Sequence, residues 1–249
     1  MFGTLALNNS DLLILILICF FAGLIRGFSG FGLSAFVMSL ALTIIPPIEL
    51  IPVCWWMELV ASVFMIRNGW KHSDKKISII LWLGAVLGLP IGIALTTILD
   101  FQTSKIVALV LILILALILL RNFKIQFLST SVGTISSGVF AGVATGLASI
   151  GGMIVAIYVL AIQNSATRVR ASLVLYIFLN SVTTFIFLIL FDVMDHKAFV
   201  RGVLLAVPSS IGVVLGSILF MQKLEKYYRP FSLGLLITFC TVGLIRLIG

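Results

Sequence analysis

Two glycine-rich segments lie inside long apolar stretches, at positions where an interrupted helix would leave backbone N–H groups available to a ligand. They read Arg26-Gly-Phe-Ser-Gly-Phe-Gly32 and Thr145-Gly-Leu-Ala-Ser-Ile-Gly-Gly152. Because glycine has no Cβ, the backbone can turn there and approach a ligand closely. A helix that restarts after such a turn directs unpaired N–H groups and its positive dipole end at the turn, which favours an anion. The predicted anion-binding residues are Gly27, Ser29, Gly30, Gly32, Gly146, Ser149, Gly151 and Gly152.

The same glycines have a second interpretation. The spacings Gly23-xxx-Gly27 and Gly138-xxx-Gly142-xxx-Gly146 suit close packing of membrane helices. An isolated motif of this kind would indicate packing. The two segments occur twice and in the middle of apolar stretches, which favours a functional role.

Three polar side chains in the apolar stretches are further candidates. Arg26 is a basic residue inside an apolar block, so it is predicted to bind an oxyanion; the alternative is that it extends to the membrane surface. Glu58 is an acidic residue inside a span, and it could carry a coupled proton, neutralise Arg26 or form a structural pair. Asn180 is predicted to line the same cavity, with interhelical hydrogen bonding as the alternative. Trp55 and Trp56 are expected in an interfacial aromatic belt.

Enzymatic chemistry has little support in the sequence. No HExxH or G-x-S-x-G motif occurs, and Ser29 and Ser149 have no His or Lys base on the same block. We expect no cofactor and no metal. The net charge of +8 comes from Lys and Arg in short connections, which indicates contact with a membrane surface rather than nucleic acid.

The elements that would position these residues are membrane-spanning helices. Of the 249 residues, 61% are hydrophobic and only 10% charged. Stretches of about 20 apolar residues can cross the hydrocarbon core, where helix satisfies the backbone. We therefore expect an all-α, multi-pass protein of the cell membrane, with the lipid bilayer as its surroundings. The apolar blocks are 12–46, 50–67, 78–98, 105–121, 131–162, 171–191, 199–220 and 230–248.

The blocks indicate an internal duplication. A shift of 119 residues places Phe21-Ala22-Gly23 on Phe140-Ala141-Gly142 and Gly32 on Gly151. We therefore predict two transmembrane repeats, 1–125 and 126–249. Blocks 12–46 and 131–162, the first and fifth, contain the breaks and either cross as broken helices or double back as re-entrant hairpins. In transporters, paired interruptions of this kind mark the binding site.

The distribution of charge favours hairpins. If both broken blocks double back, eleven basic residues share one face of the membrane, and four share the other, namely Lys105, Lys197, Arg201 and Arg246. Eight plain crossings give a weaker bias. The rule that positive loops are cytoplasmic then favours two halves in inverted orientation, with both termini outside.

The segment Gly142-Val-Ala-Thr-Gly-Leu-Ala-Ser-Ile-Gly-Gly152, its counterpart near the N-terminus and the sequence Arg170-Ala-Ser172 resemble the TauE/SafE sulfite exporter family. The resemblance covers essentially the whole chain, although Phe31-Gly32-Leu33-Ser34 has fewer adjacent glycines than the family pattern. It implies movement of sulfite, sulfonates or related small organosulfur anions across the cytoplasmic membrane. Since the chain has no nucleotide-binding motif, we expect a secondary carrier that works by alternating access. A carrier of other organic anions such as carboxylates, a channel and a non-transporting scaffold subunit are the alternatives, and homo-oligomerisation is left open.

Overall fold

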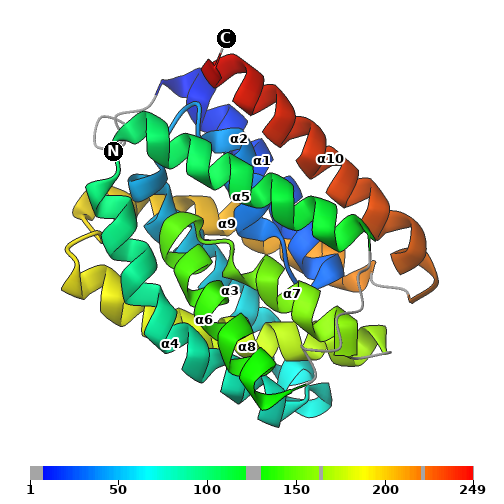
Figure 1. Cartoon of the computed structure of the whole chain (residues 1–249). Helices are drawn as coiled ribbons and strands as arrows, with labels where there is room; N and C mark the ends of the chain where they lie inside the picture. Colours follow the sequence, from blue (N-terminus) through cyan, green and yellow to red (C-terminus); the bar gives the residue numbers. More distant parts are fainter. Residues whose placement is uncertain (1–7, 122–129, 163–164, 220–221, 249) are drawn as a thin grey trace.

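A computed structural model describes residues 8–121, 130–162, 165–219 and 222–248. Within these ranges the regular secondary structure is helical and contains no strand (Figure 1). The helices are α1 (Asn9–Ser29), α2 (Leu33–Ala41), α3 (Pro47–His72), α4 (Lys75–Ile98), α5 (Phe101–Arg121), α6 (Ser131–Ala148), α7 (Gly151–Ile162), α8 (Ala166–Leu190), α9 (His196–Ile218) and α10 (Gln222–Ile248).

Seven helices in the described part of the chain are long and apolar enough to cross a bilayer: α1, α3, α4, α5, α6, α8 and α9. The shortest of them, α6, has 18 residues, which gives a length of roughly 27 Å at 1.5 Å per residue. Large side chains such as Leu87, Ile98 and Leu190 are exposed on the outside of the bundle, where lipid would cover them. The prediction of an all-α, multi-pass membrane protein is confirmed.

Polar residues set the starts of several helices. Asp74, Thr130 and Asp195 each accept a hydrogen bond from a backbone N–H in the first turn of α4, α6 and α9. Asp100 does the same before α5, accepting from the N–H groups of Gln102 and Thr103 at 3.0 Å. Hydrogen bonding to Thr103, through its side chain and its backbone, lowers the pKa of Asp100.

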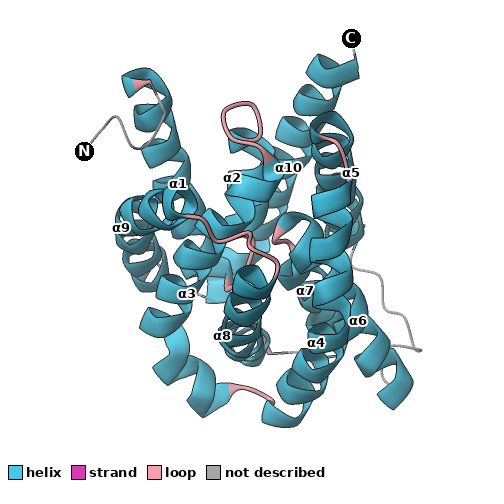
Figure 2. Ribbon diagram, turned by 90° about the vertical axis from the view of Figure 1, so that its left-hand side faces the viewer, coloured by secondary structure: helices cyan, strands magenta, loops and turns pink. Residues whose placement is uncertain are grey.

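Both broken blocks double back on themselves. In the second, the Tyr158 hydroxyl on α7 lies 2.7 Å from Thr134 Oγ1 near the start of α6, so α7 returns alongside α6. In the first, α2 lies beside α1 (Figure 2). Glu49, at the start of α3, pairs at 2.5 Å with Arg201 near the start of α9, and α9 runs parallel to α1. The chain has therefore returned, by α3, to the end of the bundle at which α1 begins.

Glycines allow the backbones of several long helices to pack closely. A side chain on the glycines of α4 would overlap backbone atoms of α6, and the glycines of α9 are related to α1 in the same way. In both pairs the residue numbers of the contacts rise together, so the helices run parallel. The glycines are Gly84, Gly88 and Gly92 on α4, Gly138, Gly142 and Gly146 on α6, Gly23 and Gly27 on α1, and Gly212 and Gly216 on α9. These contacts are the packing role that the small-xxx-small spacing indicates.

Helix α3 runs parallel to α9 and α4 runs parallel to α8. Two further pairs are antiparallel. Trp55 near the start of α3 stacks on Phe185 near the end of α8, while Gly69 near the end of α3 contacts Val174 near the start of α8. Helices α5 and α10 also lie side by side in opposite directions (Figure 1). Because the main contacts between α1–α5 and α6–α10 occur in matching pairs, such as α1 on α9 with α6 on α4, we propose that the division into 1–125 and 126–249 reflects two related halves.

Candidate functional site

A buried cavity lies between the two helix breaks. Its wall is formed by the start of α2, the middle of α3, the α6–α7 break and the middle of α8. Five of the residues singled out in the sequence line it: Gly32, Glu58, Ser149, Gly152 and Asn180. The two breaks, far apart in the sequence, thus contribute to one site.

The first break is made by two glycines in the left-handed conformation. Gly30 ends α1 with φ of 85°, and Gly32 precedes α2 with φ of 91°. The N–H of Gly30 donates to Arg26 O at 2.9 Å and closes the last turn of α1. A side chain is strained at either position whatever space surrounds it, which explains why glycine is needed at this turn.

Arg26 is fully buried at the end of α1 and does not line the cavity. Its Nε donates to Glu58 Oε2 at 2.8 Å, and Nη2 donates to Ser62 Oγ at 3.2 Å. Nη1 donates to the carbonyl of Gly30. The side chain does not extend to the membrane surface and forms an ion pair with Glu58, as both the neutralisation and the structural-pair interpretations predict. Binding of an anion by Arg26 stays a prediction.

The carboxylate of Glu58 occupies the start of α2. Its Oε1 accepts from the Ser34 hydroxyl at 3.0 Å and from the Ser34 N–H at 3.4 Å. An acidic group at a helix N-terminus is stabilised by the unpaired N–H groups and the helix dipole. Guanidinium groups of Arg26 and Arg170 also meet the carbonyls of Gly30 and Gly27 at the end of α1, so two cations and one carboxylate gather at the first break.

The second break turns at Ser149 and Ile150. Ser149 has φ of 56°, a conformation that non-glycine residues rarely adopt, and its N–H donates to Thr145 O at 2.7 Å. A Cβ at Gly151 would overlap the Ala141 carbonyl and the Thr145 side chain, so α7 begins in close contact with α6. Strained non-glycine residues of this kind cluster at functional sites, and Ser149 lines the cavity.

Polar groups without partners face the cavity from α8. Tyr176 is 1% exposed and Asn180 is 6% exposed. The Tyr176 hydroxyl lies near Thr145 but makes no hydrogen bond of normal length and angle, and Asn180 Oδ1 has no partner either. A buried polar group without a partner costs free energy. The cavity is therefore suited to a polar occupant.

The other predicted residues lie outside the cavity wall. Gly27 packs against Val213 of α9, and Gly146 packs against Gly92 and Ile93 of α4, in agreement with the packing interpretation. The Ser29 hydroxyl bonds the carbonyls of Ile25 and Phe31 and holds the turn together. Gly30 and Gly151 shape the two turns. These residues support the breaks without reaching the cavity.

Sequence reasoning missed several residues of the wall: Ser34, Trp55, Thr145, Tyr176 and Thr184. Trp55 was expected at the membrane surface, which is wrong for this residue: it is 6% exposed and its Nε1 donates to Ser181 O at 2.8 Å. Tyr176 lies one helical turn before Asn180, so a polar stripe along 176, 180 and 184 was the available signal.

The donors at this site suit binding rather than bond-breaking chemistry. Within the described ranges no group of three or more His, Cys, Asp or Glu residues could hold a metal ion. The cavity offers hydroxyls, an amide and the N–H groups of two helix starts, and Glu58 is the charged side chain that lines it among the described residues.

Comparison with known protein families identifies the chain. The family model for the sulfite exporter TauE/SafE matches residues 15–242. The chain belongs to this family. The family consists of membrane transporters rather than enzymes, and the multi-pass helical bundle agrees with it. No curated protein and no solved structure matches the chain significantly.

Proposed function

We propose that this protein is a secondary carrier of small anions, with sulfite, sulfonates or related organosulfur anions as substrates. The observation that carries the proposal is the cavity at which two helix starts, those of α2 and α7, meet. Helix N-termini stabilise anions through unpaired N–H groups and the dipole, and discontinuous helices serve this purpose in transporters.

The substrate class follows from the donors and the family. A sulfite or sulfonate group has three oxygen acceptors, which N–H groups and hydroxyls can hold from several directions without a metal ion. A small carboxylate is the second candidate. It is favoured by the fact that the Glu58 carboxylate already binds at the start of α2.

Alternating access is the proposed mechanism. Each cavity-forming helix start belongs to a hairpin, α1–α2 or α6–α7, that is packed through glycines onto a long helix of the other proposed half. Rocking of one half against the other would open the cavity to either face in turn. The lipid bilayer surrounds the protein, nucleic acid is not an expected partner, and a homo-oligomer is compatible with the proposal.

Flux measurements in proteoliposomes test this function. Purified protein should move radiolabelled sulfite, methanesulfonate or acetate down an imposed gradient at a saturable rate, with exchange accelerated by the same anion on the opposite side. Empty liposomes and the cation choline provide the controls. Flux equal to that of empty liposomes for every anion would favour the scaffold interpretation. A non-saturable rate without exchange acceleration would indicate a channel.

Glu58 is the proposed proton-coupling residue. The titratable groups around it in the described chain are Arg26 on α1, Cys54 on α3 itself and Tyr176 across the cavity on α8. Glu58→Gln removes the exchangeable proton and should flatten the pH dependence of flux without weakening anion binding. Glu49→Gln is the matched control, because Glu49 also pairs with an arginine but lies at the start of α3 and outside the cavity wall.

A further inference from the structure

The helix starts that meet at the cavity differ in charge. At the start of α2, the Glu58 carboxylate accepts from the N–H and hydroxyl of Ser34 and is held from behind by Arg26 Nε at 2.8 Å. Its side chain is 13% exposed, so it remains part of the cavity wall. The position that an anion would take at this helix start is therefore filled by the protein's own carboxylate.

The start of α7 has no such group. Among the described residues lining the cavity, none on α6, α7 or α8 is acidic. Under the shift of 119 residues, Glu58 falls on Ile177 and Arg26 falls on Thr145. Ile177 lies at the helix start in the same way, because its Cδ1 would be 3.2 Å from a Cβ placed at Gly152. The charged pair of the first half thus corresponds to a neutral pair in the second.

The unpartnered polar groups lie on this neutral side. The Tyr176 hydroxyl and Asn180 Oδ1 have no hydrogen-bond partner, and both residues are more than nine-tenths buried in the cavity wall. Tyr176 can donate directly to an anion. Turning the Asn180 amide over would present its Nδ2 to the anion while Oδ1 meets the Thr184 hydroxyl, which now lies 3.4 Å from Nδ2.

We propose that Glu58 is a resident anion that fills the start of α2, and that the transported oxyanion binds at the start of α7, held by the Tyr176 hydroxyl and the Asn180 amide. This proposal rests on the proposed function. It makes the paired breaks unequal: the start of α2 is occupied by the protein's own carboxylate, and the start of α7 is left as the single site for a transported anion. Tyr176 and Asn180 then determine specificity, because they contact the substrate oxygens.

Moving the resident anion to the other helix start tests the proposal directly. Ile177→Glu places a carboxylate at the start of α7, where it should exclude the substrate and raise the KM for sulfite by about a hundredfold or abolish uptake. Ile177→Gln has the same size without the charge and should retain most of the uptake. Equal KM values for the two variants, in protein that elutes and melts alike, would overturn the proposal.

A second variant keeps the test decisive if Ile177→Glu does not fold. Tyr176→Phe removes one hydroxyl from the wall and should raise the KM for sulfite roughly tenfold or more, the usual effect of losing a hydrogen bond to a charged group. Tyr158→Phe is the matched control, since the Tyr158 hydroxyl bonds Thr134 and lies outside the cavity wall. An unchanged KM for Tyr176→Phe contradicts the proposed site.

The wild-type protein separates this proposal from the proposed function. If wild-type proteoliposomes take up none of sulfite, methanesulfonate and acetate, the carrier function fails. If the wild type takes up one of them and the variants at 176 and 177 behave like their controls, the function stands and the site at the start of α7 is overturned.

Discussion

Arg26 and Glu58 form a buried pair whose charges are satisfied by each other and by neighbouring groups of the two helix ends. Nε of Arg26 lies 2.8 Å from Glu58 Oε2. Its Nη1 donates to the carbonyl of Gly30, and its Nη2 donates to the hydroxyl of Ser62. Replacing one member of such a pair leaves a buried charge uncompensated, which typically costs about 3–5 kcal/mol. A direct role of Arg26 in anion binding must therefore be separated from its role in compensating the charge of Glu58, which requires variants of both residues.

Arg26→Ala should weaken anion binding because it leaves the Glu58 carboxylate unneutralised at the cavity wall. If neutralisation is its role, the double variant Arg26→Ala/Glu58→Gln should restore most of the lost affinity. If Arg26 binds the anion itself, the double variant should remain about ten- to a hundredfold weaker than Glu58→Gln alone. Sulfite titrations of the single and double variants, with thermal melting to confirm folding, distinguish the two roles.

Ser149 combines backbone strain with a position in the cavity wall. Its φ of 56° costs about 1–2 kcal/mol for a residue with a Cβ, a cost that glycine avoids. We expect Ser149→Gly to raise the melting temperature and, if the hydroxyl binds the anion, to weaken sulfite binding about tenfold. Under the shift of 119 residues Ser149 corresponds to Gly30, which has φ of 85° and avoids this cost because it has no Cβ. A variant that is both more stable and equally active would show that the hydroxyl has no role in binding.

The sequence could identify the breaks but not the wall between them. Glycine clusters inside apolar blocks have a direct backbone meaning, and the structure places turns at 30–32 and at 149–150, within the predicted segments. Tyr176 was missed because the polar stripe along 176, 180 and 184 was not recognised, and Thr145 because a single hydroxyl in an apolar helix has no recognisable signal until its partners are known. Gly27 and Gly146 were grouped with the turns because sequence cannot distinguish a glycine that faces a cavity from one that faces a neighbouring helix.

At the scale of elements, the hairpins depend on backbone contacts that tolerate no side chain. Gly151→Val would place a side chain into the Ala141 carbonyl, and Gly32→Val would force a branched residue to φ of 91°. Either should abolish sulfite flux by displacing the helix start. Gly234→Val on α10 is the control, because a Cβ there has no neighbour within 4 Å. Normal flux in folded Gly151→Val protein would show that the start of α7 does not need its present position.

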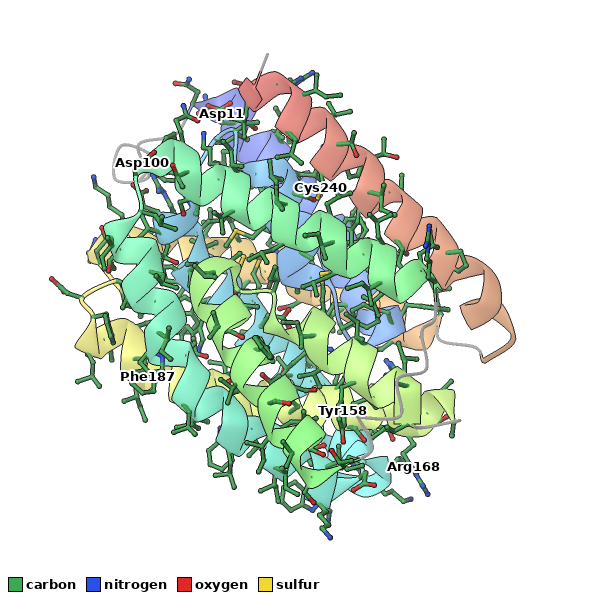
Figure 3. The ribbon with its side chains drawn as sticks, in the orientation of Figure 1. Asp11, Asp100, Tyr158, Arg168, Phe187 and Cys240 are labelled. Atoms are coloured by element: carbon green, nitrogen blue, oxygen red, sulfur yellow. The ribbon has the colours of Figure 1, made fainter. Side chains whose placement is uncertain are left out.

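At the scale of the whole molecule, the hairpins agree with the proposed inverted halves. With α2 and α7 returning beside α1 and α6, the α3–α4 turn and the start of α8 lie at one end, and the Asp74 N–H donates to Ser172 Oγ there at 3.0 Å. The α4–α5 connection lies at the opposite end: Asp100 and Asp11 lie toward the same end of the molecule in Figure 3, opposite Arg168. Lys71, Lys75 and Arg168 surround a hollow at the first end, which the positive-inside rule places in the cytoplasm.

Cysteine labelling tests this topology with four positions that the two arrangements pair differently. His72, Gln102, Arg168 and His196 are all exposed, and each lies near the end of a helix. In the hairpin arrangement, His72 and Arg168 share the cytoplasmic face while Gln102 and His196 share the outer face. Eight plain crossings would instead place His72 with His196 and Gln102 with Arg168.

The experiment uses single cysteines at these positions, in a background without Cys19, Cys54 and Cys240. On intact cells, an impermeant maleimide should react only with the cysteines at 102 and 196. The cysteines at 72 and 168 should react after the cells are permeabilised. Labelling of 72 together with 196 would contradict both the hairpins and the inverted halves, and with them the single cavity between α2 and α7.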